Sequence, residues 1–446
     1  MTTVFTKSRI FIIFAVILTL LAIWFYPVYK NWRKDTLIEQ LNELSVIVDE
    51  KPGSGHLWVN FFRRPFSDDD TIKAYDYLLR LERVSKGITR IYYEETEITS
   101  IPSRIGEFSK LELLDLTSSS ERKSRNRLRS LPDSIGKLVR LKYLILKGNE
   151  IESLPNSIGQ LKQLVKLDLV DNRLTSVPKS ISQLKKLESF YLAGNRLTSI
   201  PDSIGQLERL ESLQLRRNQL TSIPSSISQL KRLTRLGLDD NKLTSLPNTI
   251  GQLEALQSLS LPNNLLTKVP NTIGRLKRLR FLDLESNELV QLPNSIGQLE
   301  SLEQLKLKRN QLTSVPNSIS QLKELSDLRL SNNRLASVPK SIGQLTKLNH
   351  LYLDNNQLTS VPIFIGQLSK LEWLKLNDNR ITSLPDSIGR LKLLKVLDLN
   401  KNPLKSLPKS IIISCLEGTP LATTSDLAKQ LAQITHSGRA CFPNNQ

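Results

Sequence analysis

The sequence predicts an α/β solenoid, in which similar coils stack and each coil adds one strand to a curved parallel sheet of about 14 strands. From Leu141 onward one pattern recurs every 23 residues, as in LKYLILKGNEIESLPNSIGQLKQ followed by LVKLDLVDNRLTSVPKSISQLKK. An asparagine returns at one place in the pattern, and a proline follows each asparagine six positions later. The asparagines are residues 126, 149, 172, 195, 218, 241, 264, 287, 310, 333, 356, 379 and 402.

Each coil begins with the strand. In LxxLxLxxN the apolar first, fourth and sixth places face inward, and LxL alternates with the period of two that is typical of a strand. The asparagine at the ninth place carries a donor and an acceptor, so it can satisfy backbone groups where the chain turns inside the stack. In LTSxPxSIGQL the proline ends strand pairing, and the remainder returns as a turn or short helix. No coil can bury its own apolar edge, so neighbouring coils bury it.

The repeats are predicted to cover residues 88–410. Two coils precede the regular series, beginning at Ile88 and Leu111, and the second carries seven extra residues within TSSSERKSR. Before them, residues 30–87 are predicted to form a helical N-terminal cap from KDTLIEQLNELSVIVDE and DDDTIKAYDYLLRLERVSK. Residues 411–446 are predicted to form a C-terminal cap, with SDLAKQLAQIT as a short amphipathic helix, and a loose tail.

This pattern resembles the leucine-rich repeat. The 23-residue form with NxLTSxPxSIGQL is similar to the intracellular group found in scaffold proteins for Ras-type GTPases, in related plant proteins and in many bacterial repeat proteins. It lacks the Gly-x-Ile-Pro turn of plant receptor ectodomains and the Cys-rich caps of animal extracellular members. The resemblance implies a horseshoe that binds a protein on its concave face, and it does not say which protein.

An uncharged segment lies near the N-terminus. After a tail of residues 1–9, the run IFIIFAVILTLLAIWFY lies between Arg9 and Lys30, and residues 10–29 are predicted to form a transmembrane signal-anchor helix. A cleaved signal peptide is the alternative, but bulky Trp24 and Phe25 stand where small residues favour cleavage. Basic residues are nearly balanced across the segment, so the side of the repeat domain stays undetermined, with the cytoplasm slightly preferred.

The sequence offers no catalytic or cofactor motif. His56, His350 and His436 are far apart, and neither a P-loop nor a dinucleotide-binding G-x-G-x-x-G occurs. Cys415 and Cys441 are the two cysteines, and Cys415 is interpreted as a cap thiol rather than a nucleophile. We therefore expect no enzyme activity, no metal and no cofactor.

The concave face should carry the partner site, because its third, fifth, seventh and eighth places are free from core packing. These places hold a mixture of aromatic, basic and acidic residues close to charge balance, whereas a nucleic-acid groove should be more uniformly basic. Aromatic residues and arginines are favoured anchors of protein interfaces. The predicted partner-binding residues are Tyr143, Tyr191, Arg216, Arg217, Arg235, Phe281, Lys306, Lys308, Arg329, His350, Tyr352 and Trp373.

The chain has a formal charge of +19, from 62 Lys and Arg against 43 Asp and Glu, and much of the excess lies in the return segments. These charges are interpreted as a solvated face, with contact to anionic lipid as the alternative. The predicted function is a membrane-anchored scaffold that binds a protein on its concave face, for example in signal transduction. Two alternatives stay open: an exported adhesin or host-interaction protein, and a lipid or nucleic-acid binder that uses the basic surface. Oligomeric state is not predicted.

Overall fold

The computed structural model describes residues 26–50, 56–62, 68–84, 87–94, 96–118, 126–408 and 410. The chain divides into two compact units, Met1–Arg173 and Leu174–Gln446, which are taken here one at a time. The predicted C-terminal cap and tail, residues 411–446, lie outside the described residues.

The first unit begins with the N-terminal cap. It contains a helix over residues 26–43, the antiparallel strands β1 (Val46–Glu50) and β2 (Leu57–Phe62), and helix α2 (Asp68–Val84). The prediction of a purely helical cap was wrong for the two strands. The run SVIVDE continues the apolar spacing of the preceding helix, but its β-branched residues favour a strand, and Val46 buries its side chain on the same face as Phe61.

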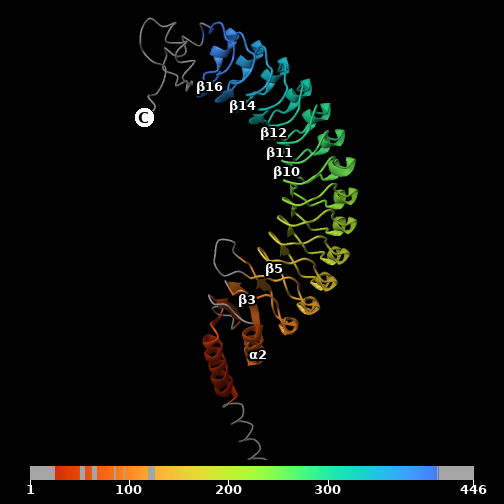
Figure 1. The fold of residues 1–446 in the computed structure, drawn as a ribbon, viewed down its shortest axis with the longest axis vertical. Coiled ribbons are helices and arrows are strands. Elements are labelled where there is room, and N and C mark those ends of the chain that lie inside the picture. Colours follow the sequence, from red (N-terminus) through yellow and green to blue (C-terminus); the bar gives the residue numbers. More distant parts are fainter. Residues whose placement is uncertain are drawn as a thin grey trace, which may run out of the picture. The chain divides into compact units, whose positions relative to one another are not determined.

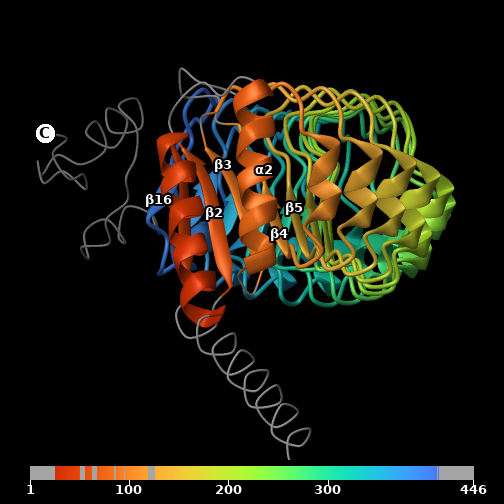
Figure 2. The same cartoon turned by 90° about the horizontal axis from the view of Figure 1, so that it is seen from below.

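Aromatic rings fill the interior of this cap. Phe61 stacks on Tyr93 with ring centroids 4.1 Å apart, and the Tyr93 hydroxyl donates to the Tyr75 hydroxyl at 2.9 Å. Tyr75 belongs to α2, which lies across the strands of the cap (Figure 2). Burial raises the pKa of the Tyr75 and Tyr93 hydroxyls, so both stay neutral and hydrogen-bonded.

One half-buried glutamate of the cap has a buried oxygen without a partner among the described residues. Glu82 on α2 has an Oε2 atom with no hydrogen-bond partner among the described residues. Burial raises the pKa of Glu82 to about 7, although the charge and the backbone of Lys110 lower it. The cap interior therefore contains a group that titrates near neutral pH.

The repeat strands of the first unit follow β2 in parallel and in chain order. They are β3 (Ile88–Glu94), β4 (Leu113–Asp115), β5 (Tyr143–Ile145) and β6 (Lys166–Asp168).

The second unit contains ten further strands, and those whose pairings are described are parallel and in register. They are β7 (Ser189–Tyr191), β8 (Ser212–Gln214), β9 (Arg235–Gly237), β10 (Ser258–Ser260), β11 (Phe281–Asp283), β12 (Gln304–Lys306), β13 (Asp327–Arg329), β14 (His350–Tyr352), β15 (Trp373–Lys375) and β16 (Val396–Asp398). Strands β3 to β16 fall at the 14 predicted strand segments, which confirms the solenoid of parallel strands.

Every described return segment forms a short 3-10 helix that begins directly after the repeated proline. Within the second unit these helices lie on the outer side of the curve and the strands on the inner, concave side (Figure 1). The helices are η1 (Ser103–Glu107), η2 (Asp133–Lys137), η3 (Asn156–Gln160), η4 (Lys179–Gln183), η5 (Asp202–Gln206), η6 (Ser225–Gln229), η7 (Asn248–Gln252), η8 (Asn271–Arg275), η9 (Asn294–Gln298), η10 (Asn317–Gln321), η11 (Lys340–Gln344), η12 (Ile363–Gln367) and η13 (Asp386–Arg390).

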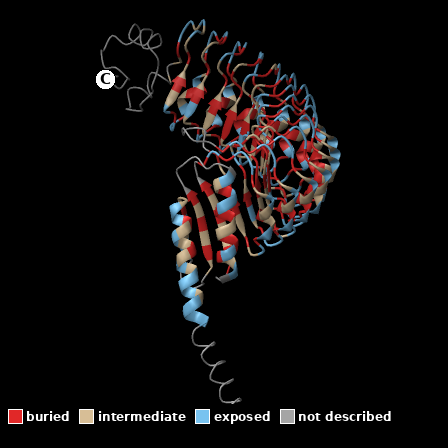
Figure 3. Cartoon of the chain, turned by 60° about the horizontal axis from the view of Figure 1, so that its bottom comes forward, coloured by how far each residue is buried: buried red, intermediate tan, exposed pale blue. Residues whose placement is uncertain are grey.

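The interior of the coils is built mainly from leucine. In a typical coil Leu279, Leu282 and Leu284 from the strand segment and Ile296 from the return helix are fully buried. Buried residues accordingly run along the inside of each coil, while exposed residues mark the turns (Figure 3).

The repeated asparagine joins its own coil to the preceding one. The Leu266 amide donates to Asn287 Oδ1 at 3.0 Å, and Asn287 Nδ2 donates to the carbonyls of Leu261 at 3.0 Å and Leu284 at 3.1 Å. The same arrangement recurs at the other asparagines of the second unit. In the first coil Thr96 takes this place and donates its hydroxyl to Asn126 Oδ1. The predicted role of the ninth place is confirmed.

The residue before each asparagine from Asn149 onward leaves the strand in a left-handed conformation. Arg217, Ser286 and Arg309 have φ values of +53°, +54° and +56°. A non-glycine residue pays a steric cost there, which the fixed hydrogen bonds of the following asparagine offset. The eighth place is therefore a corner of the coil rather than part of the flat sheet face.

The predicted membrane anchor lies mostly outside the described residues. Residues 26–29 start the helix over 26–43, and residues 10–25 are not described. Within the described ranges, none of the helices combines the length and apolar character needed to span a bilayer.

Candidate functional site

The concave face of the second unit begins with small polar side chains. Strands β8 to β10 present Ser212, Gln214, Gly237, Ser258 and Ser260, which we call the polar floor. Gly237 leaves room that the Gln214 amide occupies, because a Cβ at Gly237 would lie 2.1 Å from Gln214 Oε1. Apart from Arg235 at the margin, the third and fifth places here offer neither an aromatic ring nor a charge.

The next strands carry the Phe281 cluster, formed by Phe281, Asp283 and Lys306. Lys306 Nζ lies 4.7 Å from the centroid of the Phe281 ring and 3.4 Å from the Asp283 carboxylate. Asp283 is only 8% exposed, and its burial raises its pKa although Lys306 and the Glu285 amide lower it. The lysine is thus matched by a carboxylate and a ring before any partner arrives.

Strands β13 to β15 carry the Trp373 cluster, formed by Arg329, His350, Tyr352, Trp373 and Lys375. The His350 and Tyr352 rings are nearly parallel, with centroids 6.3 Å apart, and His350 lies 6.1 Å from Trp373. Arg329 lies 5.2 Å and Lys375 5.9 Å from the centroid of the Tyr352 ring. Trp373 is 36% exposed, so this cluster offers an accessible aromatic surface.

Arg329 in this cluster is held by its own carboxylate. It donates through Nε to Asp327 Oδ1 at 3.0 Å and through Nη2 to Asp327 Oδ2 at 2.9 Å, and Asp327 is 8% exposed. This pairing raises the pKa of Arg329 and fixes its guanidinium next to Tyr352. The arginine therefore serves as an ordered wall of the cluster.

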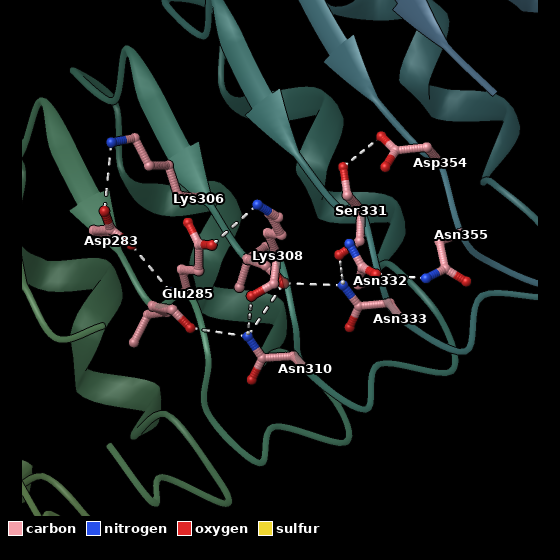
Figure 4. Close-up of polar contacts among 12 residues, drawn as sticks. Asp283, Glu285, Lys306, Lys308, Asn310, Ser331, Asn332, Asn333, Asp354 and Asn355 are labelled. Carbon is pink, nitrogen blue, oxygen red and sulfur yellow. Dashed lines mark hydrogen bonds and ion pairs between the residues drawn. The ribbon is translucent and has the colours of Figure 1, made fainter. Parts of the chain in front are cut away.

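Polar contacts between coils border both clusters (Figure 4). Lys308 lies 3.4 Å from Glu285, and the Ser331 hydroxyl donates to Asp354 Oδ1 at 2.6 Å. Asn355 donates its amide to Asn332 Oδ1 at the corners of adjacent coils. These contacts link side chains of neighbouring coils along the rim.

The structure brings six of the predicted residues together: Phe281 and Lys306 in one cluster, and Arg329, His350, Tyr352 and Trp373 in the other. Lys308 borders the Phe281 cluster. Tyr143 lies in the first unit, while Tyr191, Arg216, Arg217 and Arg235 lie on or directly after β7 to β9. Whether any of them touches a partner stays a prediction.

Sequence reasoning missed an aromatic region in the first unit. The Arg90 guanidinium lies 4.5 Å from the centroid of the Trp58 ring and hydrogen-bonds the Tyr92 hydroxyl. Further along the same face, Leu113 pairs in register with the exposed Tyr143. The predicted strand at Ile88 already places Arg90 and Tyr92 on this face, but Trp58 is on β2, which the sequence analysis did not predict.

Part of the basic charge of the return segments is used between coils. Lys185, Lys231 and Lys277 donate to the carbonyls of Gln206, Gln252 and Gln298 in the following coil at 3.0, 3.1 and 3.0 Å. Lys277 also pairs with Glu300 at 2.8 Å. These contacts give the lysines a structural role and weaken the alternative of a free basic binding surface. Among the described residues, no group of three His, Cys, Asp or Glu side chains has the geometry of a metal site.

Comparison with family models decides what kind of protein this is. The model of the leucine-rich repeat region matches residues 91–197, 190–271, 233–313 and 268–364, and a second leucine-rich repeat model matches residues 346–404. The chain belongs to the leucine-rich repeat family. This fold is a general scaffold for protein interaction, as the sequence predicted. A search of curated proteins found no match.

Solved structures of other leucine-rich repeat proteins are similar to this one. A leucine-rich repeat protein of Leptospira interrogans matches with 35% identity and a TM-score of 0.71, over 81% of this chain and 93% of its own. The ectodomain of the Arabidopsis thaliana receptor kinase GASSHO1/SCHENGEN3, in complex with CASPARIAN STRIP INTEGRITY FACTOR 2, matches with 33% identity and a TM-score of 0.56, over 75% of this chain and 43% of its own. An internalin from Listeria monocytogenes matches with 26% identity and a TM-score of 0.56, over 63% of this chain and 80% of its own.

Proposed function

We propose that this leucine-rich repeat protein is a membrane-anchored, non-catalytic scaffold that binds a protein partner on its concave face, with the Trp373 cluster as the main anchor. The observation that carries the proposal is the gathering of Trp373, Tyr352, His350 and Arg329 on three adjacent strands, because buried aromatic and arginine side chains dominate the energy of protein interfaces. The complex formed by the similar Arabidopsis ectodomain supports a polypeptide as the ligand.

Photo-crosslinking in the cells that produce the protein tests this proposal. A photoreactive phenylalanine analogue at position 373 should give a specific covalent adduct with a partner. The control position is 393, because Leu393 is 52% exposed but lies in a return segment away from the sheet. Adducts at 373 and none at 393 support the proposal. Equal adducts at both positions, or adducts at 393 alone, contradict it.

The membrane anchor is a second part of the proposal. Its support is the uncharged run within residues 10–29, followed by Lys30, Arg33 and Lys34. A full-length chain should remain in the membrane pellet after carbonate washing, and a variant with two arginines in place of Leu20 and Leu21 should not. Release of the full-length chain by carbonate would contradict the anchor.

The repeat domain is proposed to face the cytoplasm, with signal transduction as the context of the scaffold. The 23-residue form of the repeats supports this side. Impermeant maleimide should label Cys415 and Cys441 only after cells are permeabilised, once the thiols are shown to be reduced. Labelling of intact cells would contradict a cytoplasmic domain and favour the alternative of an exported adhesin or host-interaction protein.

A further inference from the structure

Two lysines of the concave face occupy the same place in their coils but differ in their partners. Lys306 on β12 and Lys375 on β15 both stand at the fifth place, and each ammonium group lies near an aromatic ring. Lys306 also has the Asp283 carboxylate at 3.4 Å. Among the described residues, no carboxylate lies within ion-pair distance of Lys375.

Lys375 has a tyrosine on one neighbouring strand and an aspartate on the other. In the sheet register Lys375 lies between Tyr352 on β14 and Asp398 on β16. Its ammonium group is directed over Tyr352, while Asp398 Oδ1 accepts the Asn400 amide at 3.2 Å. The nearby cation Arg329 is already paired with Asp327. Lys375 is thus a half-buried cation with a ring beside it and, in the described part of the chain, no carboxylate within ion-pair distance.

Apolar surface lies directly next to this cation. Trp373 precedes it by two residues on the same strand, and His350 lies opposite Trp373 in register. The half-buried Val396 continues the third place on β16. A ligand that reaches Lys375 therefore also covers aromatic and aliphatic side chains at the third place.

We propose that the Trp373 cluster recognises a polypeptide segment in which an acidic side chain stands next to an apolar one, with the carboxylate on Lys375 and the apolar side chain on Trp373 and His350. This inference rests on the proposed function and names the chemistry of the partner. A carboxylate supplies the counter-charge that Lys375 lacks, and partial desolvation by the rings strengthens the pairing. The Phe281 cluster does not need a carboxylate from the ligand, because Asp283 already pairs with Lys306.

A random peptide library displayed with its C-termini fused to the carrier, and screened against the full-length protein, tests this inference. The fusion removes free C-terminal carboxylates, so any selected carboxylate is a side chain. The wild-type protein should enrich peptides with Asp or Glu beside an aromatic or aliphatic residue. Lys375→Gln should bind a selected peptide about tenfold more weakly, as expected for loss of one charge-assisted contact. Lys375→Glu should select Lys or Arg instead.

Lys306→Gln is the matched control, because it removes a lysine at the same place of its coil that also lies near an aromatic ring of the preceding strand. It should leave the preference for acidic peptides unchanged. Asp398→Asn tests the neighbouring carboxylate and should change affinity by less than about twofold, as expected for a group outside the contact. A large gain of affinity in Asp398→Asn would show that Asp398 neutralises Lys375, which overturns the inference.

Three further results would overturn it: selection of peptides without acidic residues, equal effects of Lys375→Gln and Lys306→Gln, and unchanged binding in Trp373→Ala. Binding only to peptides with a free C-terminus would overturn the acidic side chain as the source of the carboxylate. Crosslinks at position 373 in cells together with any of these results would leave the proposed function standing and remove only the partner chemistry. The unfolding midpoint of each variant, measured by circular dichroism, shows that these surface changes leave the fold intact.

Discussion

The ninth place of the coils keeps one residue type throughout, whereas the residues of the concave sheet face vary from coil to coil. From Asn126 to Asn402 the ninth place is always asparagine, because its side chain bonds the backbone of its own coil and of the preceding coil. The third and fifth places change from Ser258 and Ser260 on β10 to Trp373 and Lys375 on β15. Identical coils need identical backbone bonding, whereas the sheet face has no such duty. Variation along the face therefore marks where binding can be specified.

The largest effect is expected from breaking the asparagine column. Asn287→Ala leaves the Leu266 amide without a partner and removes one of the two amide donors from each of the Leu261 and Leu284 carbonyls. The unsatisfied amide costs about 1–3 kcal/mol and each lost hydrogen bond about 1 kcal/mol, so we expect the free energy of unfolding to fall by about 3 kcal/mol. Urea unfolding followed by circular dichroism measures this loss.

Asn294→Ala in the same coil is the control. Asn294 is an exposed residue at the start of η9, and its substitution should change stability by less than about 0.5 kcal/mol. Similar losses in the two variants would mean that the asparagine column is not what holds the coils together.

The next largest effect is a pH dependence of stability that arises in the cap and not in the repeats. The cap interior holds Glu82, whose raised pKa of about 7 means that the folded state binds its proton more tightly than the unfolded state. The part of the first unit's stability that depends on Glu82 should therefore be greatest at and below about pH 4.5, fall as pH rises toward 7, and level off above 7. Glu82→Gln should remove this fall, so the variant is more stable than the wild type at pH 8. Unfolding midpoints at pH 5 and pH 8 measure the difference, and an equal pH dependence in both proteins would contradict it.

A smaller effect is expected at the half-buried ion pair of Asp327 and Arg329 on the concave face. Asp327→Asn removes the charge that holds Arg329 and should lower stability by about 1 kcal/mol, as for the loss of a charge-assisted hydrogen bond. The pair lies on the surface of the sheet, so the loss should stay below that of Asn287→Ala. A loss as large as that of Asn287→Ala would show that the face also holds the coils together.

The smallest effect on stability should come from the aromatic anchor. Trp373→Ala removes a side chain that is 36% exposed and packs on the outside of the sheet, so we expect the unfolding midpoint to change little. Binding of a peptide selected against the wild-type protein should nevertheless be lost, as measured by fluorescence anisotropy. Loss of stability together with binding would make Trp373 a residue of the fold rather than of the site.

The sequence predicted the repeats well because one asparagine and one proline recur every 23 residues. Their positions locate the strand and the return helix of every coil. The sequence failed at β1, whose apolar residues also fit a helix, and it overlooked β2, in which Leu57, Val59 and Phe61 alternate as in a strand. It placed Phe281, Lys306 and Trp373 on the correct face, but the pairing of Lys306 with Asp283 and of Arg329 with Asp327 depends on side-chain geometry that no period encodes. Side-chain geometry also decides that no described carboxylate lies within ion-pair distance of Lys375, so only the structure showed this.

A crosslinking scan along the third places of the second unit tests the central claim most directly. The photoreactive analogue is placed in turn at positions 189, 235, 258, 281, 304, 350, 373 and 396, and the yield of partner adduct is measured in cells. The yield should be highest at 350 and 373 and lowest at 258 on the polar floor. A flat profile, or a maximum at 258, would contradict the claim that variation along the face marks the binding site.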